Sequence, residues 1–277
     1  MVKKMQKNNL LKLIGVLFGL SILLTCTVTA LDDNNMASQA ILSPDATEKG
    51  IVKENIQKFT GSQNVVISNK GIREFPLGKM YEVTTNAGDR YYVNANTGDI
   101  EVATIHNAVS TKSMDTNDIA RMNETVQKFV EKNYRNFTAK KMTFVNSKII
   151  DHGDAGKEYI YYWNEMSGDA YTLSSVMVSF NPNLDNTLTY IGFDRPLLID
   201  TTPKISQNDA EVIARSIFKM SSAAITTSKL VIVPNEENQK LVWIVDSIEL
   251  DEKGLSHGGK ATVDALSGKV ISINPVL

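Results

Sequence analysis

Two stretches of this chain, residues 91–102 and 261–272, carry nearly the same pattern. Each reads as a strand, a tight turn that ends in glycine, and a second strand. When the glycines are aligned, four positions coincide: Val93 with Val263, Asn94 with Asp264, Ala95 with Ala265, and Gly98 with Gly268. An internal repeat constrains architecture more than any other sequence feature, because each copy must be one supersecondary unit. The pattern predicts a small hairpin-bearing module that is used at least twice.

The segments around the repeats set the expected fold class. Apolar residues at helical spacing predict three helices, over residues 44–59, from about Asp115, and from Ser206. Several β-branched or alternating runs follow each helix and predict antiparallel strands. One helix followed by several strands, three times over, indicates an α+β protein of tandem modules, each a helix packed on an antiparallel β-meander. The expected divisions are a linker (31–42), module 1 (43–107), a diverged module 2 (114–200) and module 3 (203–277).

The first thirty residues have the pattern of an export signal. Four lysines precede an apolar run from Leu13 to Leu24, and Val28 and Ala30 form a small-residue exit. This run is ~12 residues, shorter than the ~20 that a membrane-spanning helix needs. Residues 1–30 are therefore expected to be a cleaved signal peptide, and the protein to be extracellular or at the cell surface. A longer count that starts at Leu10 leaves an uncleaved anchor open, and Cys26 leaves lipidation open.

Charge and cysteine content narrow the possible functions. Cys26 is the only cysteine, so cleavage after Ala30 would exclude disulfides, thiol catalysis and cysteine-bound metals. Removing residues 1–30, with their four lysines and no acidic residue, takes the formal charge from −2 to −6. A mildly acidic chain argues against nucleic acid and against anionic membrane surfaces as partners. Two glycosylation sequons begin at Asn123 and Asn136 and could be used in a host that glycosylates exported proteins.

No residue pattern in the chain predicts catalysis, a metal site or a cofactor. The three histidines are too far apart for a helical metal motif: His106, His152 and His257. The segment from Asp151 to Asp154 contains one histidine and reads as a polar turn. Ser256 is next to His257, but adjacent residues seldom point at each other for nucleophile activation. The chain is therefore predicted not to be an enzyme. A small hydrolase stays open if His152 and Asp154 share a deep pocket.

Four aromatic residues are candidates for a recognition surface: Tyr91, Tyr159, Tyr161 and Trp163. Apolar and aromatic residues occupy both faces of the expected strand over 159–163. One interpretation is that both faces are covered by other parts of the fold. The other is an aromatic patch that recognises a peptide or a glycan, because tyrosine and tryptophan are enriched at interfaces.

The two repeat motifs resemble the closing hairpin of the PepSY domain family, whose fold is cystatin-like. The better match is Tyr92-Val93-Asn94-Ala95-Asn96-Thr97-Gly98-Asp99-Ile100, and residues 262–270 follow it closely. Within this motif, Gly98 and Gly268 fit a turn with positive φ, and Asn94 and Asp264 fit acceptors for turn amides. The resemblance implies an exported, non-enzymatic interaction module that binds or restrains a peptidase or another cell-envelope protein. A structural envelope component, or a glycan- or peptide-binding one, is the alternative.

Overall fold

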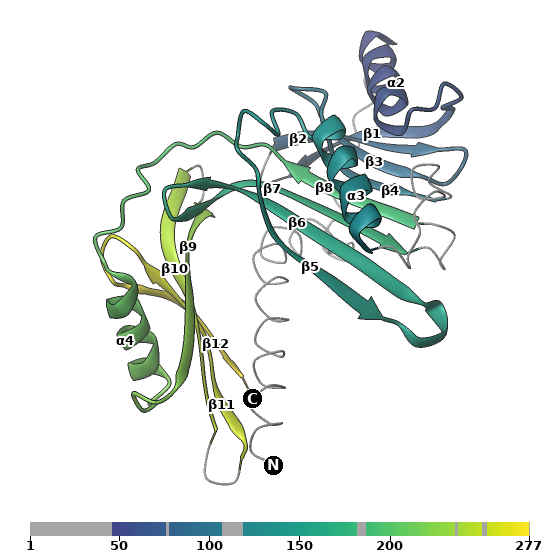
Figure 1. Cartoon of the computed structure of the whole chain (residues 1–277). Coiled ribbons are helices and arrows are strands. Elements are labelled where there is room, and N and C mark those ends of the chain that lie inside the picture. Colours follow the sequence, from purple (N-terminus) through teal and green to yellow (C-terminus); the bar gives the residue numbers. More distant parts are fainter. Residues whose placement is uncertain are drawn as a thin grey trace. The chain divides into compact units, whose positions relative to one another are not determined.

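The computed structural model describes residues 46–75, 78–106, 119–181, 187–235, 238–250 and 254–276. This part of the chain is mostly β (Figure 1). The helical elements are α2 (Ala46–Thr60), α3 (Ile119–Asn133), α4 (Gln207–Ile217) and the short 3-10 helix η2 (Gly153–Ala155). The strands are β1 (Ile67–Phe75), β2 (Gly78–Thr85), β3 (Arg90–Asn94), β4 (Ile100–Ile105), β5 (Thr143–Asp151), β6 (Lys157–Ser167), β7 (Ala170–Asn181), β8 (Thr187–Phe193), β9 (Ile225–Asn235), β10 (Asn238–Leu250), β11 (Ser256–Asp264) and β12 (Val270–Val276).

The expected tandem modules are wrong, because the strands join one mixed sheet across the expected module boundaries. Strand β4 pairs antiparallel with β8, from Val102 opposite Ile191 to Ile105 opposite Leu188. Strand β7 pairs in parallel with β9 at Ala170 and Leu230. A separate meander would expose an unpaired edge of backbone donors and acceptors, and pairing with the next strand removes that edge.

The described residues divide into two compact units. Unit 1 contains the residues up to Thr138 together with Phe144–Trp163 and Val176–Phe193. Unit 2 contains Ala139–Thr143, Asn164–Ser175 and Asp194–Leu277. Strands β6 and β7 therefore contribute residues to both units, and these divisions differ from the expected 43–107, 114–200 and 203–277.

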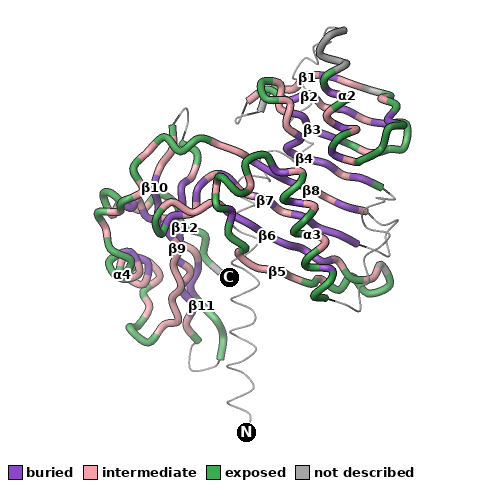
Figure 2. The backbone as a smooth tube through the Cα atoms, turned by 45° about the horizontal axis from the view of Figure 1, so that its top comes forward, coloured by how far each residue is buried: buried purple, intermediate pink, exposed green. Residues whose placement is uncertain are grey.

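Unit 1 has its core between one face of its sheet and two helices. A row of four paired residues runs across neighbouring strands, and each side chain is almost completely buried: Val83, Tyr91, Ala103 and Tyr190. The Phe59 ring of α2 contacts the rings of Tyr91, Tyr190 and Phe129. Since Phe129 belongs to α3, the two helices lie side by side over this row, where Figure 2 shows long buried stretches of the strands.

In unit 2, helix α4 packs on β9, β10 and β11 of the antiparallel strands β9 to β12, and the unit 2 residues of β7 pair in parallel with β9. Ser206 begins the helix as its N-cap, because its hydroxyl accepts a hydrogen bond from the Asp209 N–H at 3.1 Å. Ala210 and Ala214 present a flat, fully buried helix face to the sheet. Beneath the helix, Trp243 donates its indole N–H to the Ile205 carbonyl at 2.8 Å, so the polar group of this core residue is satisfied.

Candidate functional site

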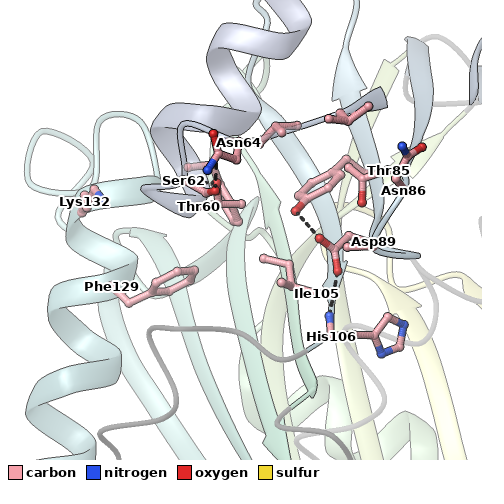
Figure 3. A pocket seen from close by; sticks show the side chains of 15 residues that line it. Thr60, Ser62, Asn64, Thr85, Asn86, Asp89, Ile105, His106, Phe129 and Lys132 are labelled. Carbon is pink, nitrogen blue, oxygen red and sulfur yellow. Dashed lines mark hydrogen bonds between the residues drawn. The ribbon is translucent and has the colours of Figure 1, made fainter. Parts of the chain in front are cut away.

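The candidate site is a pocket of about 480 Å³ in unit 1 (Figure 3). Its walls come from the end of α2 and the loop after it, the turn between β2 and β3, the end of β4, and α3. The lining residues are Phe59, Thr60, Ser62, Asn64, Val65, Val66, Thr85, Asn86, Ala87, Asp89, Tyr91, Ile105, His106, Phe129 and Lys132. A volume of this size is typical of pockets that hold a small molecule or a large side chain.

Local chain geometry opens the pocket at the points where α2 and β2 end. Helix α2 stops at Gly61, which adopts φ +73° and donates its N–H to the Gln57 carbonyl at 2.9 Å. The turn from Thr85 to Asp89 closes through two backbone bonds, from Gly88 N to Thr85 O and from Thr85 N to Asp89 O. Gly88 has φ +85°, a conformation that favours glycine. Both segments leave their elements sharply, and the space between them forms part of the pocket.

The inner wall of the pocket is aromatic. The ring centroids of Phe59 and Phe129 lie 5.6 Å apart with their planes at 84°, and Phe59 meets Tyr91 in the same edge-to-face manner at 6.4 Å. Ring pairs at these separations and angles attract each other beyond their buried area. Val65 and Ile105 are buried apolar neighbours in the same wall. This wall can accept an apolar or aromatic body.

Asp89 is the acidic group of the pocket lining. Its Oδ1 accepts the backbone N–H of His106 at 2.9 Å, and its Oδ2 accepts the Tyr91 hydroxyl at 3.4 Å. Burial raises the pKa of Tyr91, and the neighbouring Asp89 charge raises it further, so this phenol stays protonated as a donor. An ionised carboxylate can accept about four hydrogen bonds. Asp89 therefore has acceptor capacity left for a donor inside the pocket.

Two further polar groups stand at the pocket. Thr85 is 6% exposed, and its hydroxyl has no hydrogen-bond partner among the residues that the structure describes. Lys132 lies in the last turn of α3, where a cation is favoured by the helix dipole. Figure 3 shows Lys132 and Asp89 on opposite sides of the pocket. The pocket thus combines an aromatic wall with one anionic acceptor and one cation.

The histidine of the pocket is not arranged as a catalytic base. The Asp89 carboxylate accepts the backbone N–H of His106 rather than a ring N–H. The imidazole Nδ1 of His106 lies 3.4 Å from the Thr187 hydroxyl, at the long limit of a hydrogen bond. Nucleophilic catalysis needs a base held between a nucleophile and an orienting group. These contacts do not build that arrangement.

The side chain of His152 contacts Glu158. Its Nε2 lies 2.9 Å from Glu158 Oε2, and the Ser179 hydroxyl donates to Glu158 Oε1. The carboxylate thus lies between serine and histidine, whereas nucleophile activation places the histidine in the middle. Within the described ranges, no three histidine, cysteine, aspartate or glutamate side chains are grouped to hold a metal ion.

The side chain of His257 contacts Glu249 of β10. His257 Nε2 lies 3.5 Å from Glu249 Oε2, and Ser221 donates both its N–H, at 3.0 Å, and its hydroxyl to the same carboxylate. The two bonds from Ser221 lower the pKa of Glu249. Glutamate is again the central group, so the contact fixes the loop at Ser221 to β10 and β11.

The four aromatic residues proposed for a recognition patch are buried. Tyr159, Tyr161 and Trp163 are 7%, 3% and 4% exposed, and β6, which carries them, pairs with strands on both sides, β5 and β7. Trp163 packs against Phe144 at 5.6 Å. Of the two interpretations of these residues, the covered strand therefore agrees with their burial, and the exposed recognition patch does not. Tyr91, fully buried, contributes its side chain to the pocket wall instead.

The two repeated turns have the same pattern of hydrogen bonds to the backbone. Asn94 Oδ1 accepts the backbone N–H groups of Asn96 and Thr97, at 2.9 and 3.1 Å. Asp264 Oδ1 accepts those of Leu266 and Ser267, both at 2.9 Å. Gly98 and Gly268 adopt φ +75° and +74° and donate to the carbonyls of Asn94 and Asp264. These residues shape turns, as the motif predicts, and none of them lines the pocket.

Several predictions fall where the structure gives limited information. The signal peptide or anchor (1–30), Cys26 and the linker (31–42) lie outside the described residues. Asn123 lies on α3 and Asn136 in the turn after it, and both are exposed. In the described part of the chain, none of the helices combines the length and the hydropathy that crossing a bilayer requires.

No family model and no curated protein matches this chain. The resemblance to the PepSY family therefore stays a prediction that rests on the two hairpin motifs. Sequence reasoning also missed most of the pocket, including Asp89, Phe129 and Lys132, because these residues come from separate elements and share no motif.

Proposed function

We propose that this chain is a non-catalytic binding protein that holds a side chain of a partner polypeptide in the unit 1 pocket. The observation that carries this proposal is the composition of the pocket: an aromatic wall with a few converging polar groups. Such composition suits binding, since apolar contact supplies affinity and the polar groups supply orientation. The histidine contacts described above support a binding role over catalysis.

The proposed partner is a protein outside the cytoplasmic membrane. The pattern of residues 1–30 supports export, and the two PepSY-like hairpins favour an exported peptidase or another cell-envelope protein as the class of partner. The formal charge of −2, or −6 after cleavage, supports a protein partner over nucleic acid.

The test is a comparative capture from the cell-surface fraction of the native host, with the full chain carrying an affinity tag. One variant, Ala87→Trp, fills the pocket from an exposed position in the β2–β3 turn. The matched control, Asn96→Trp, places the same bulky residue at an exposed position of the β3–β4 turn, away from the pocket lining. Mass spectrometry quantifies each captured protein across the three baits.

The proposal predicts a defined exported protein that the wild type and Asn96→Trp capture equally and that Ala87→Trp captures at least tenfold less. A partner that is captured equally by all three baits would contradict the pocket as the binding site. Hydrolysis of a substrate by the purified wild type, abolished by Ala87→Trp, would replace binding with catalysis.

A further inference from the structure

We infer that the occupant of the unit 1 pocket is an aromatic side chain that carries a hydrogen-bond donor, tyrosine or tryptophan, with its ring against the aromatic wall and its O–H or N–H on Asp89. This inference deepens the proposed function and rests on it. It names the side-chain chemistry that the pocket selects.

The wall favours an aromatic body over an aliphatic one. Phe59 already packs edge-to-face against Phe129 and Tyr91, with centroids 5.6 and 6.4 Å apart. A further ring can extend the same geometry, because aromatic pairs prefer edge-to-face or offset contact at centroid separations of about 4.5–7 Å. Aliphatic side chains gain buried area at such a wall, but they lack the electrostatic attraction between aromatic rings.

Asp89 favours a donor on that ring. An occupant displaces water from the pocket, and the carboxylate then needs a replacement donor for the acceptor sites that Tyr91 and His106 do not use. A phenol or an indole provides one, whereas phenylalanine and leucine leave the carboxylate desolvated. Leaving a buried charged acceptor unpaired costs more free energy than leaving a neutral acceptor unpaired. The Asp89 carboxylate therefore selects for an occupant that carries a hydrogen-bond donor.

Thr85 supplies a second, independent indication of a polar tip. It lies at the start of the turn that ends at Asp89, it lines the pocket, and its hydroxyl is buried without a partner among the residues that the structure describes. Native proteins satisfy most buried hydroxyls, so an unpaired one calls for a partner. A tyrosine hydroxyl is both donor and acceptor and can serve Asp89 and Thr85 together.

The charges of the lining suit a side chain within a polypeptide as well as a free amino acid, and the proposed function favours the polypeptide. Lys132 lies across the pocket from Asp89 (Figure 3), where it can donate to a backbone carbonyl beside the inserted side chain. A free amino acid would instead bring an ammonium and a carboxylate of its own. The two sources share the aromatic chemistry and are separated by the experiment below.

The experiment measures the affinity of the full chain for three ligands by ligand-observed NMR: N-acetyl-tyrosinamide, N-acetyl-phenylalaninamide and free tyrosine. The first two differ by a single hydroxyl. The proteins are the wild type, Asp89→Asn and the control Asp99→Asn. Asp99 is an aspartate of the other turn in unit 1, where it pairs with Arg135 at 3.3 Å, outside the pocket lining. Asparagine at position 89 retains an oxygen for the His106 N–H.

The wild type and Asp99→Asn should bind the tyrosine amide about 10-fold or more tightly than the phenylalanine amide, the ratio expected for a hydrogen bond to a charged group. Asp89→Asn should reduce this ratio to a few-fold, because the tyrosine amide loses a hydrogen bond to a charged group and the phenylalanine amide no longer desolvates a carboxylate. Equal melting temperatures of the three proteins would show that the fold is retained.

Each other outcome overturns a defined part of the inference. Equal binding of both amides to the wild type would refute donor selection and leave the proposed binding function intact. A preference that Asp89→Asn retains would refute the role of Asp89. Tighter binding of free tyrosine than of its amide would assign the pocket to an amino acid. Absence of binding by every ligand, together with unchanged capture by Ala87→Trp, would reject the proposed function itself.

Discussion

Replacing the glycine of each repeated turn by alanine should destabilise unit 1 more than unit 2. The two positions share the same turn geometry, with φ +75° at Gly98 and +74° at Gly268. They differ in what a methyl group would meet. A Cβ at position 98 would lie 2.6 Å from Asn55 Nδ2, whereas at position 268 its nearest neighbours are side-chain carbons 3.5 Å away.

The expected costs follow from these contacts. A non-glycine residue in the left-handed region costs about 1–2 kcal/mol, and both variants pay this term. Gly98→Ala must also displace the Asn55 amide, which donates to the Gly98 carbonyl at 2.8 Å. Losing such a hydrogen bond costs about 1 kcal/mol. Gly268→Ala meets ordinary van der Waals contact from Ile205 and Ile213 and adds no comparable loss. The free energy of unfolding should therefore fall by about 1 kcal/mol more for Gly98→Ala.

The chain provides one tryptophan in each unit for the measurement, Trp163 in unit 1 and Trp243 in unit 2. Each variant keeps one tryptophan and has phenylalanine in place of the other. Urea unfolding followed by the fluorescence of the remaining tryptophan then reports the stability of the unit that contains it. A second cycle uses Asn55→Ala, which removes the side chain that the new methyl group would meet. In that background, Gly98→Ala should cost the same as Gly268→Ala. Equal costs of the two substitutions in the wild-type background would refute the argument from Asn55.

Three further predictions concern unit 2. Ser206→Ala should lower its stability by about 1 kcal/mol, measured by urea unfolding, because the helix loses the acceptor for the Asp209 N–H. Lys140→Met should cost about 2 kcal/mol in the same assay, because Glu165, 3.3 Å away, loses its cation; the cost is below the about 3–5 kcal/mol of a fully buried pair since Glu165 is 18% exposed. Burial raises the pKa of Asp264, but hydrogen bonds from turn N–H groups outweigh burial and lower this pKa below its usual value of 3.8. The ionised Asp264 therefore stabilises the fold above pH 3.8, and this stabilisation is lost as the pH falls through the lower folded-state pKa. Acid titration of stability should show that wild type loses this contribution and that Asp264→Asn does not.

Periodicity in the sequence predicts which segments are helices or strands better than it predicts the residues where they begin and end. The helix from Ser206 and its N-cap could be predicted because a capping serine precedes a clear apolar stripe. Strand β1 runs from Ile67 to Phe75, whereas the β-branched run in the sequence, residues 65–67, ends at the first residue of the strand. The rest of the strand contains Lys70, Arg73 and Glu74, which carry no strand signal. This segment is a strand because it pairs with β2 through eight registered positions, a tertiary condition that local propensity does not contain.

The assembly and the pocket could not be predicted for the same reason. The repeat correctly indicated two equivalent turns, but whether β4 ends a module or pairs with β8 depends on residues about ninety positions away. Tyr161 was compatible with a surface or with a covered strand, and only the strands on both sides of β6 decide between them. Asp89 and Phe129 belong to different elements, and no spacing in the chain relates them.

The most direct test of the binding account is a methyl NMR spectrum of the full chain titrated with N-acetyl-tyrosinamide. Val65 and Ile105 line the pocket, whereas Val263 and Ile232 lie in the core of unit 2. The account predicts saturable shifts at Val65 and Ile105, little change at Val263 and Ile232, and loss of the shifts in Ala87→Trp. Shifts that are confined to unit 2, or that persist in Ala87→Trp, would contradict the pocket as the binding site.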